Sequence, residues 1–205
     1  RSVEPIFSLV PAGLDTSRAL TDQFAEGLRS ISGTPSQRAG AVQALGARLG
    51  VQLVPHEAEY LAAPGRGLPT IDAVRRVYER WLAAGAASTG VLDAIQGAVT
   101  LRRDTVERSI NADSIPTFAM LLMRSRLIHP DPQSAVGDAA FRKLLTAFFR
   151  PTIVYDRVAT ERARQDLRRS VPNVKYTLRA GEKIVGAHEV VGREEHEKMR
   201  ALRDE

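Results

Sequence analysis

Apolar residues recur at helical spacing through much of the first 150 residues, and this periodicity constrains the fold more than any other feature. Between residues 15 and 33, each large apolar residue follows the previous one by three or four positions. These residues are Leu20, Phe24, Leu28 and Ile31. We therefore predict a helix here, capped by Asp15 or Thr16 and ended by Gly33. Such a helix has to bury its apolar face against other elements.

Further segments show helical or strand-like patterns along the chain. We predict helices over 36–50, 56–63, from Ile71 to about 85, from Asp113-Ser114 to 128, and over 134–149, 160–170 and 193–205. The stretch 64–70, with two Gly and two Pro, is predicted to be a loop. Segment 97–110 is rich in β-branched residues and predicts two short strands, or one kinked strand. Further strands are predicted over 151–155, 174–178, 182–185 and 188–191.

These elements predict an α+β fold, mainly helical, with a small sheet formed near the two termini and in the middle segment. No long linker interrupts the chain, so we predict one domain over residues 1–205. Its helical part is expected at about 14–95 and 114–149. Its β-containing part is expected at about 1–10, 98–111 and 151–205.

The composition excludes several classes of protein. The chain has no Cys, which rules out disulfides, Cys-ligated zinc and thiol catalysis. The densest apolar run, Ile115 to Met123, is far shorter than the roughly 20 residues of a spanning helix. No signal-peptide pattern occurs at the N-terminus. Because the chain begins with Arg rather than Met, we expect it to be part of a longer protein.

No pattern of catalytic or metal-binding residues stands out. The four His residues lack the spacing of metal ligands, and the chain contains no HExxH, His-Asp or GxSxG sequence. The loop over 64–70 lacks the GK[ST] ending of a phosphate-binding loop. We therefore predict no catalytic residue, no metal site and no cofactor, and the sequence does not identify ligand-binding residues.

The strongest electrostatic feature is the Arg-rich segment 157–169, in a chain whose formal net charge is +5. Arg157, Arg164 and Arg168 can share one helical face, interrupted by acidic residues. A solvated helix is the simplest interpretation. Contact with an anionic membrane surface is an alternative. A nucleic-acid partner is disfavoured because no recognition motif accompanies the charge.

The last quarter of the chain resembles the juxtamembrane end of the extracytoplasmic domain in seven-transmembrane HD-domain phosphohydrolases. The shared pattern is a strand, a helix with T-x-x-x-R, and a G-E-x-I-V hairpin. Three positions depart from it: Thr152 replaces a usual Asn, Gly192 a capping Thr, and His188 a turn Gly. His tolerates left-handed backbone geometry, so the turn can survive. The matching residues are Pro151, Tyr155, Asp156, Thr160, Arg164, Val171, Val174, Gly181, Glu182, Ile184, Val185, Glu189, Val190 and Val191.

This resemblance implies an extracytoplasmic sensor or ligand-binding domain, anchored in a bacterial membrane by segments outside this chain. The cytoplasmic HD domain of such proteins hydrolyses a cyclic dinucleotide, cyclic di-AMP in the characterised branch. Because none of those catalytic residues lies here, the chain itself is expected to be no enzyme, although the full-length protein would be a phosphodiesterase. The implied partners are its own transmembrane helices, the membrane surface, a small ligand or envelope protein, and a second copy in a homodimer. A structural or protein-interaction domain is the alternative function.

One phrase occurs twice: "RSVEPIFSL" over 1–9 and "RSVPNVKYT" over 169–177. The family repeats such a motif near the start and the end of the domain. The resemblance therefore predicts a membrane-proximal sheet that holds both phrases, with Pro5–Leu9 close to Val174–Leu178. It also predicts that the first 14 or so residues lie near 152–156.

Overall fold

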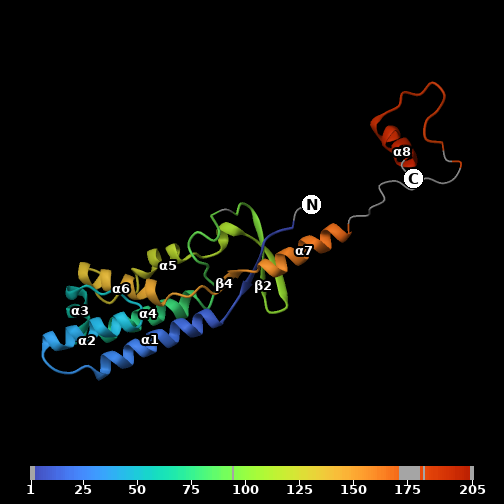
Figure 1. Cartoon of the computed structure of the whole chain (residues 1–205). Coiled ribbons are helices and arrows are strands. Elements are labelled where there is room, and N and C mark those ends of the chain that lie inside the picture. The colour runs from blue at the N-terminus through green and yellow to red at the C-terminus, as the bar shows by residue number, and fades with distance from the viewer. Residues whose placement is uncertain (1–2, 94, 171–180, 182, 204–205) are drawn as a thin grey trace. The chain divides into compact units, whose positions relative to one another are not determined.

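The computed structural model describes residues 3–93, 95–170, 181 and 183–203. The chain divides into two compact units, Arg1–Glu161 and Arg162–Glu205, and each is described by itself. The larger unit holds most of the helices and the sheet (Figure 1). The single domain predicted over residues 1–205 stays a prediction.

Six helices form the helical part of the first unit. The apolar faces predicted from the sequence meet in one core, where Phe24, Val42, Tyr78, Phe141 and Phe148 are fully buried. Within it, α1 packs against α4, α2 against α3, and both α3 and α4 against α6 (Figure 1). The helices are α1 (Ala12–Ser30), α2 (Pro35–Arg48), α3 (Pro55–Ala62), α4 (Gly67–Trp81), α5 (Phe118–Ser125) and α6 (Ala135–Phe148).

Side-chain caps define where several helices begin. Thr34 and Gln37 form a reciprocal capping box at the start of α2, with Pro35 in the first turn. Ser134 accepts a hydrogen bond from the Gly137 N–H at the start of α6, at a distance of 3.0 Å. The boundaries predicted for α2 and α6 are therefore correct to within two residues.

Within the helical part, three helix starts were predicted wrongly. α1 begins at Ala12, so neither Asp15 nor Thr16 caps it. α4 begins at Gly67 and includes residues that were predicted as loop, because its first turn has no intrahelical bond for a Pro to remove. α5 begins only at Phe118, after a short 3-10 helix, Ala112–Ser114. A Pro at 116 disfavours the helical conformation of the residue before it, which explains this delay.

The small sheet joins segments that are distant in sequence. Its strand order is β3-β2-β1-β4. β1 lies at the centre, parallel to β2 with Ile6 opposite Thr100, and antiparallel to β4 with Phe7 opposite Tyr155. This arrangement confirms the α+β prediction and the expected proximity of the first residues to 152–156. The strands are β1 (Ile6–Leu9), β2 (Ala98–Arg103), β3 (Val106–Asn111) and β4 (Ile153–Tyr155).

The two faces of the sheet differ in polarity. Phe7, Val99 and Ile153 lie on one face and form a second apolar cluster with Ala87 and Ile115. On the other face, polar residues lie opposite one another in neighbouring strands. The pairs are Ser8 with Arg102, Arg102 with Glu107, and Thr100 with Ser109. Alternation along each strand produces this contrast.

The helix α7 (Arg157–Ser170) starts directly after β4, and α8 (Arg193–Arg203) lies in the second unit. His188 has a positive φ angle of 72°, so the left-handed geometry expected there is confirmed, and Gly181 also has a positive φ angle, of 84°. Gly192 provides no side-chain cap, although its carbonyl accepts the His196 N–H at 3.1 Å.

The strand predictions over 182–185 and 188–191 are wrong where the structure describes them, because residues 183–185 and 188–191 form bends, turns and irregular chain. A short hairpin needs further strands or a helix to cover it, and no described strand pairs with these residues. The strand predicted over 174–178, and its proximity to Pro5–Leu9, lie outside the described residues.

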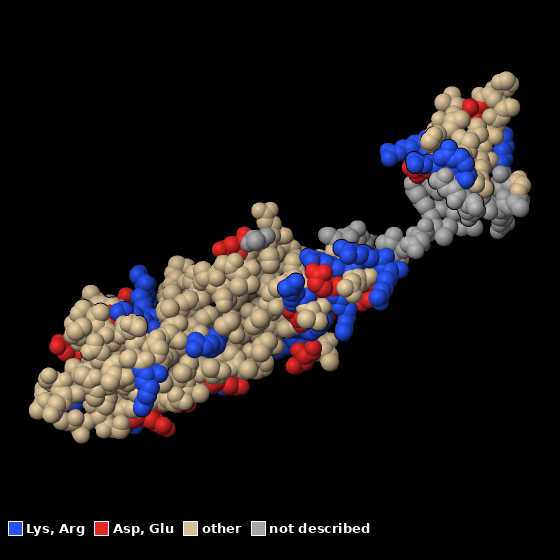
Figure 2. Space-filling model, viewed as in Figure 1, with Lys and Arg blue, Asp and Glu red and all other residues tan. Residues whose placement is uncertain are grey.

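Charged side chains are unevenly distributed on the face seen in Figure 2. They are sparse over the helical part and gather where the sheet gives way to α7. Among the described residues, no helix is both long enough and apolar enough to cross a membrane.

Candidate functional site

The described residues contain no cluster of three or more His, Asp or Glu side chains that could hold a metal ion. Of the four His, His129 is the buried one. Its Nδ1 accepts the Asp131 N–H at 3.1 Å, and its ring packs edge-on against Phe141. His129 therefore has a packing role, and functional contacts have to be sought elsewhere.

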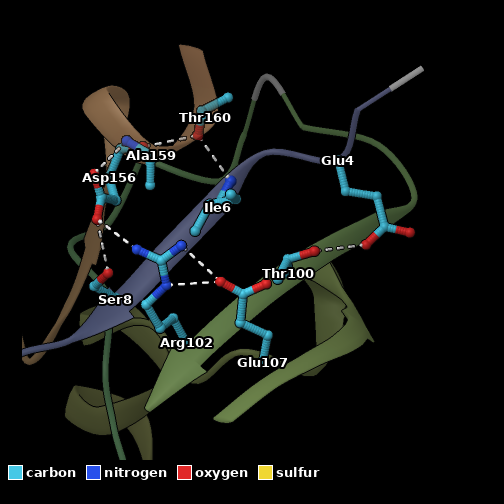
Figure 3. A network of polar contacts seen from close by, with 9 residues as sticks. All are labelled: Glu4, Ile6, Ser8, Thr100, Arg102, Glu107, Asp156, Ala159 and Thr160. Atoms are coloured by element: carbon cyan, nitrogen blue, oxygen red, sulfur yellow. Dashed lines mark hydrogen bonds and ion pairs between the residues drawn. The ribbon is translucent and has the colours of Figure 1, made fainter. Parts of the chain in front are cut away.

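The most connected polar contacts join β1 to the first turn of α7 (Figure 3). The Ile6 carbonyl accepts the Asp156 N–H at 2.8 Å, and the Ile6 N–H donates to Thr160 Oγ1 at 2.9 Å. The Thr160 hydroxyl in turn donates to the Asp156 carbonyl at 2.8 Å. We call this set of three residues the Ile6 clamp. Because Thr160 is fully buried, water does not compete for these bonds.

Asp156 also caps α7 with its side chain. Its Oδ1 accepts the Ala159 N–H at 2.9 Å, and its Oδ2 accepts the Ser8 hydroxyl at 3.1 Å. The hydrogen bond from Ala159 is the main cause that lowers the pKa of Asp156, with Ser8 and the charge of Arg102 adding to it, while partial burial opposes them. The capping carboxylate is therefore held in its charged form.

We expect the first unit to lose stability in acid through Asp156. Because its folded-state pKa is lowered, the carboxylate stabilises the fold above the ordinary Asp pKa of about 3.9, and this contribution is lost as pH falls through the folded-state value. The contribution is part of the roughly 1 kcal/mol of a good helix cap. Urea midpoints measured between pH 3 and 6 should fall less steeply with acid in Asp156→Asn than in wild type. Equal slopes would contradict this role.

Further polar contacts lie around β1, from Arg102 in β2 and from Glu4 just before β1. Arg102 Nε donates a hydrogen bond to Glu107 Oε1 at 2.8 Å, and Arg102 Nη1 lies 3.7 Å from Asp156 Oδ2 (Figure 3). The Glu4 carboxylate accepts the hydroxyls of Thr100 and Ser109, each at 3.0 Å. Because these groups are partly exposed, each pair adds little stability. Their effect is to fix the position of residues 4–8 relative to β2 and β3.

The residues singled out by the resemblance are only partly brought together. Thr160 belongs to the Ile6 clamp, and the Tyr155 ring packs on Phe7 with centroids 5.5 Å apart. Pro151 contacts the first turn of α1. Arg164 lies further along α7, and Gly181, Ile184 and Val185 lie in the second unit. Val171 and Glu182 lie outside the described residues.

Ile6 and Arg102 were not predicted as site residues, and Asp156 was named only as a match to the strand pattern of the family. A capping signal was present in the sequence, since an Asp precedes the Arg-rich helix, but the helix was predicted to start at Thr160. The partners of Asp156 come from strands about 50 and 150 positions earlier in the chain, and no local pattern announces such pairings.

Comparison with known proteins agrees with the sequence resemblance. The family model described as 7TM-HD extracellular matches residues 1–203. No curated protein and no solved structure gives a significant match. The matched family places the chain on the extracytoplasmic side of a membrane protein. The chain therefore belongs to the family of extracellular domains of seven-transmembrane HD proteins.

Proposed function

We propose that this chain is the extracytoplasmic sensor, or ligand-binding, domain of a membrane-bound HD-type phosphohydrolase. It would regulate a cytoplasmic catalytic domain, absent from this chain, that hydrolyses a cyclic dinucleotide such as cyclic di-AMP. The observation that carries the proposal is the Ile6 clamp, because it bonds the first strand directly to the helix that follows the last strand.

A sensor has to convert binding in one place into a change in another. In the proposed protein, one transmembrane segment precedes β1 and others follow α7. The clamp bonds residues 154 and 150 positions apart, so a shift of the helical part that moves β4 also moves β1. A ligand that binds one arrangement of these elements more tightly would shift the population of the whole domain.

The membrane surface and the transmembrane helices are the proposed partners of the α7 region. α7 carries five Arg and two acidic residues, and its Val158 side chain is 73% exposed. Arg side chains beside an exposed apolar residue suit contact with anionic lipid headgroups. A second copy of the chain is a further proposed partner, and nucleic acid is not proposed.

The test uses the full-length protein in membranes, with hydrolysis of cyclic di-AMP as the readout. Thr160→Val removes the acceptor of the buried Ile6 N–H, a loss of about 1–3 kcal/mol. We expect hydrolysis to change several-fold in this variant. Thr146→Val is the matched control, since the Thr146 hydroxyl is exposed and bonds only within α6. Hydrogen exchange at Ile6 checks that the clamp has opened. Open clamps with unchanged hydrolysis would contradict the sensor role.

One observation favours the alternative, a structural or protein-interaction domain of the cell envelope. Met123 and Leu127, at the end of α5 and just beyond it, are 67% and 91% exposed. Large apolar side chains exposed close together suit a protein contact. If Met123→Ser and Leu127→Ser abolish a protein contact and leave regulation intact, this alternative explains the α5 surface.

A further inference from the structure

The turn between α1 and α2 lies at the end of the helical part away from the sheet (Figure 1). A groove is formed beside this turn. It consists of two adjoining hollows of about 400 and 490 Å³. Both are lined by Arg38 of α2 and by residues 62–64 at the end of α3. Volumes of this size suit a small organic molecule.

The walls of the first hollow are apolar and are contributed by four helices. Their positions are fixed where α3 meets α4. A Cβ on Gly67 would overlap the carbonyl oxygen of Leu61, so the two backbones are in direct contact there. The hollow is therefore a formed feature of the packing and does not depend on exposed side chains alone. Its apolar side chains are Leu28, Ile31, Val42, Leu61, Leu68 and Pro69.

Arg38 is the cation shared by both hollows. Within the described part of the chain, its guanidinium makes no hydrogen bond or ion pair, and Nε is buried without an acceptor. Arg66 and Arg102, by contrast, pair with carboxylates. A partly buried guanidinium without a partner is unfavourable, because its lost contacts with water are not replaced. A ligand that brings an acceptor to the terminal Nη groups would pair the charge of Arg38, which has no partner within the described residues.

The charge of the groove restricts the ligand. Glu59 lines the second hollow, so one carboxylate and one guanidinium face the same space. Glu59 repels every negative charge in this space, so a ligand with two or more negative charges is disfavoured more strongly than one whose single carboxylate is directed at Arg38. Guanidinium and carboxylate also match geometrically, since they can form two parallel hydrogen bonds.

We propose that this groove binds a small monocarboxylate with an apolar body, its carboxylate paired with Arg38 and its body in the hollow lined by Leu28 and Leu68. The proposal rests on the proposed sensor function, for which it names the ligand class. A free organic acid and the C-terminus of a short apolar peptide share this chemistry.

The experiment titrates the chain with three probes and follows amide shifts by NMR. The probes are hexanoate, N-acetyl-Ala-Ala with a free carboxylate, and the same peptide with an amide end. We expect at least one carboxylate to bind the wild type and the amide to bind more weakly. Arg38→Gln should weaken carboxylate binding by about tenfold or more, the effect of one charge-assisted pair. Arg29→Gln is the matched control, since Arg29 is exposed and lines neither hollow.

A second variant guards against misfolding of Arg38→Gln. Ala63→Leu fills the space shared by the hollows and leaves Arg38 in place, so it should also abolish binding. Absence of binding by both carboxylates, or equal binding by Arg38→Gln and wild type, would overturn the site. Binding that requires Arg38, without any effect on hydrolysis by the full-length protein, would support the site and overturn the sensor function.

Discussion

Replacing Gly13 by Ala is expected to destabilise the first unit by about 3 kcal/mol, at the upper end of the range for overpacking. A Cβ at this position in α1 would overlap the carbonyl oxygen of Pro151 and lie 3.2 Å from that of Arg150. These are backbone atoms, so no side-chain rotation relieves the overlap. The next turn of α1 holds the same segment, since Ser17 Oγ accepts the Arg150 N–H at 3.1 Å. Urea unfolding of the chain measures the loss.

Gly40→Ala is the matched control for this prediction. Gly40 lies within α2, and a Cβ there would meet nothing within 4 Å. Ala has a higher helix propensity than Gly, so we expect a gain of about 0.5–1 kcal/mol. Opposite signs for the two substitutions would establish that the close approach of α1 to Pro151 is specific. A neutral Gly13→Ala would refute it.

Replacing Thr152 by Val is expected to destabilise the same unit by about 1–3 kcal/mol, because the buried Ala86 N–H loses its acceptor and the Leu82 carbonyl keeps only its bond from the Gly85 N–H. The Thr152 side chain is buried. Its hydroxyl accepts the Ala86 N–H and donates to the Leu82 carbonyl, both at 3.0 Å. The hydroxyl therefore provides hydrogen-bond partners for backbone groups directly after α4, where helix carbonyls lack intrahelical partners. Val has nearly the same shape and offers neither group.

Thr152→Ser distinguishes the contribution of the hydroxyl group to stability from that of the methyl group. Ser keeps both hydrogen bonds and loses one buried methyl, which costs about 1 kcal/mol. We therefore expect the order wild type, Ser, Val in unfolding free energy, measured by urea titration. Equal losses for Ser and Val would mean that the methyl group, not the hydroxyl, is what matters. The hydroxyl contacts also explain how Thr serves at a position where the resemblance leads one to expect Asn.

The fold could be predicted where its signals are local. The caps at Thr34 and Ser134 stand next to their helices, and the Asp104 turn, with φ of 53°, separates two strands that follow each other directly. The starts of α1, α4 and α5 were missed near a Pro, because the same residue can end a loop or begin a helix. The starts of α2 and α3, at Pro35 and Pro55, were predicted to within one residue. The left-handed backbone at His188 was expected only because the resemblance placed a turn there.

Most of the candidate site could not be predicted from such local signals. Thr160 was named through the resemblance, yet its function, to accept the Ile6 N–H, depends on a strand 154 positions earlier. Ile6 itself contributes only backbone atoms to the clamp, which any residue except proline could supply. The groove at Arg38 likewise depends on where α1 and α3 end and where α4 begins in space. When ordinary residues far apart in the sequence come together in the fold, no pattern in a single sequence indicates it.

The antiparallel pairing of β1 with β4 has a mechanical consequence. Glu4 and Arg157 lie at the same end of this pair, so a force that separates them acts across the hydrogen bonds and not along the strands. Hydrogen bonds loaded in this way break one after another along the strand pair, beginning at Ile6. The hydrogen bond from the Ile6 N–H to the Thr160 hydroxyl lies where this separation starts. It is therefore the first bond that has to break when the two chain segments are pulled apart.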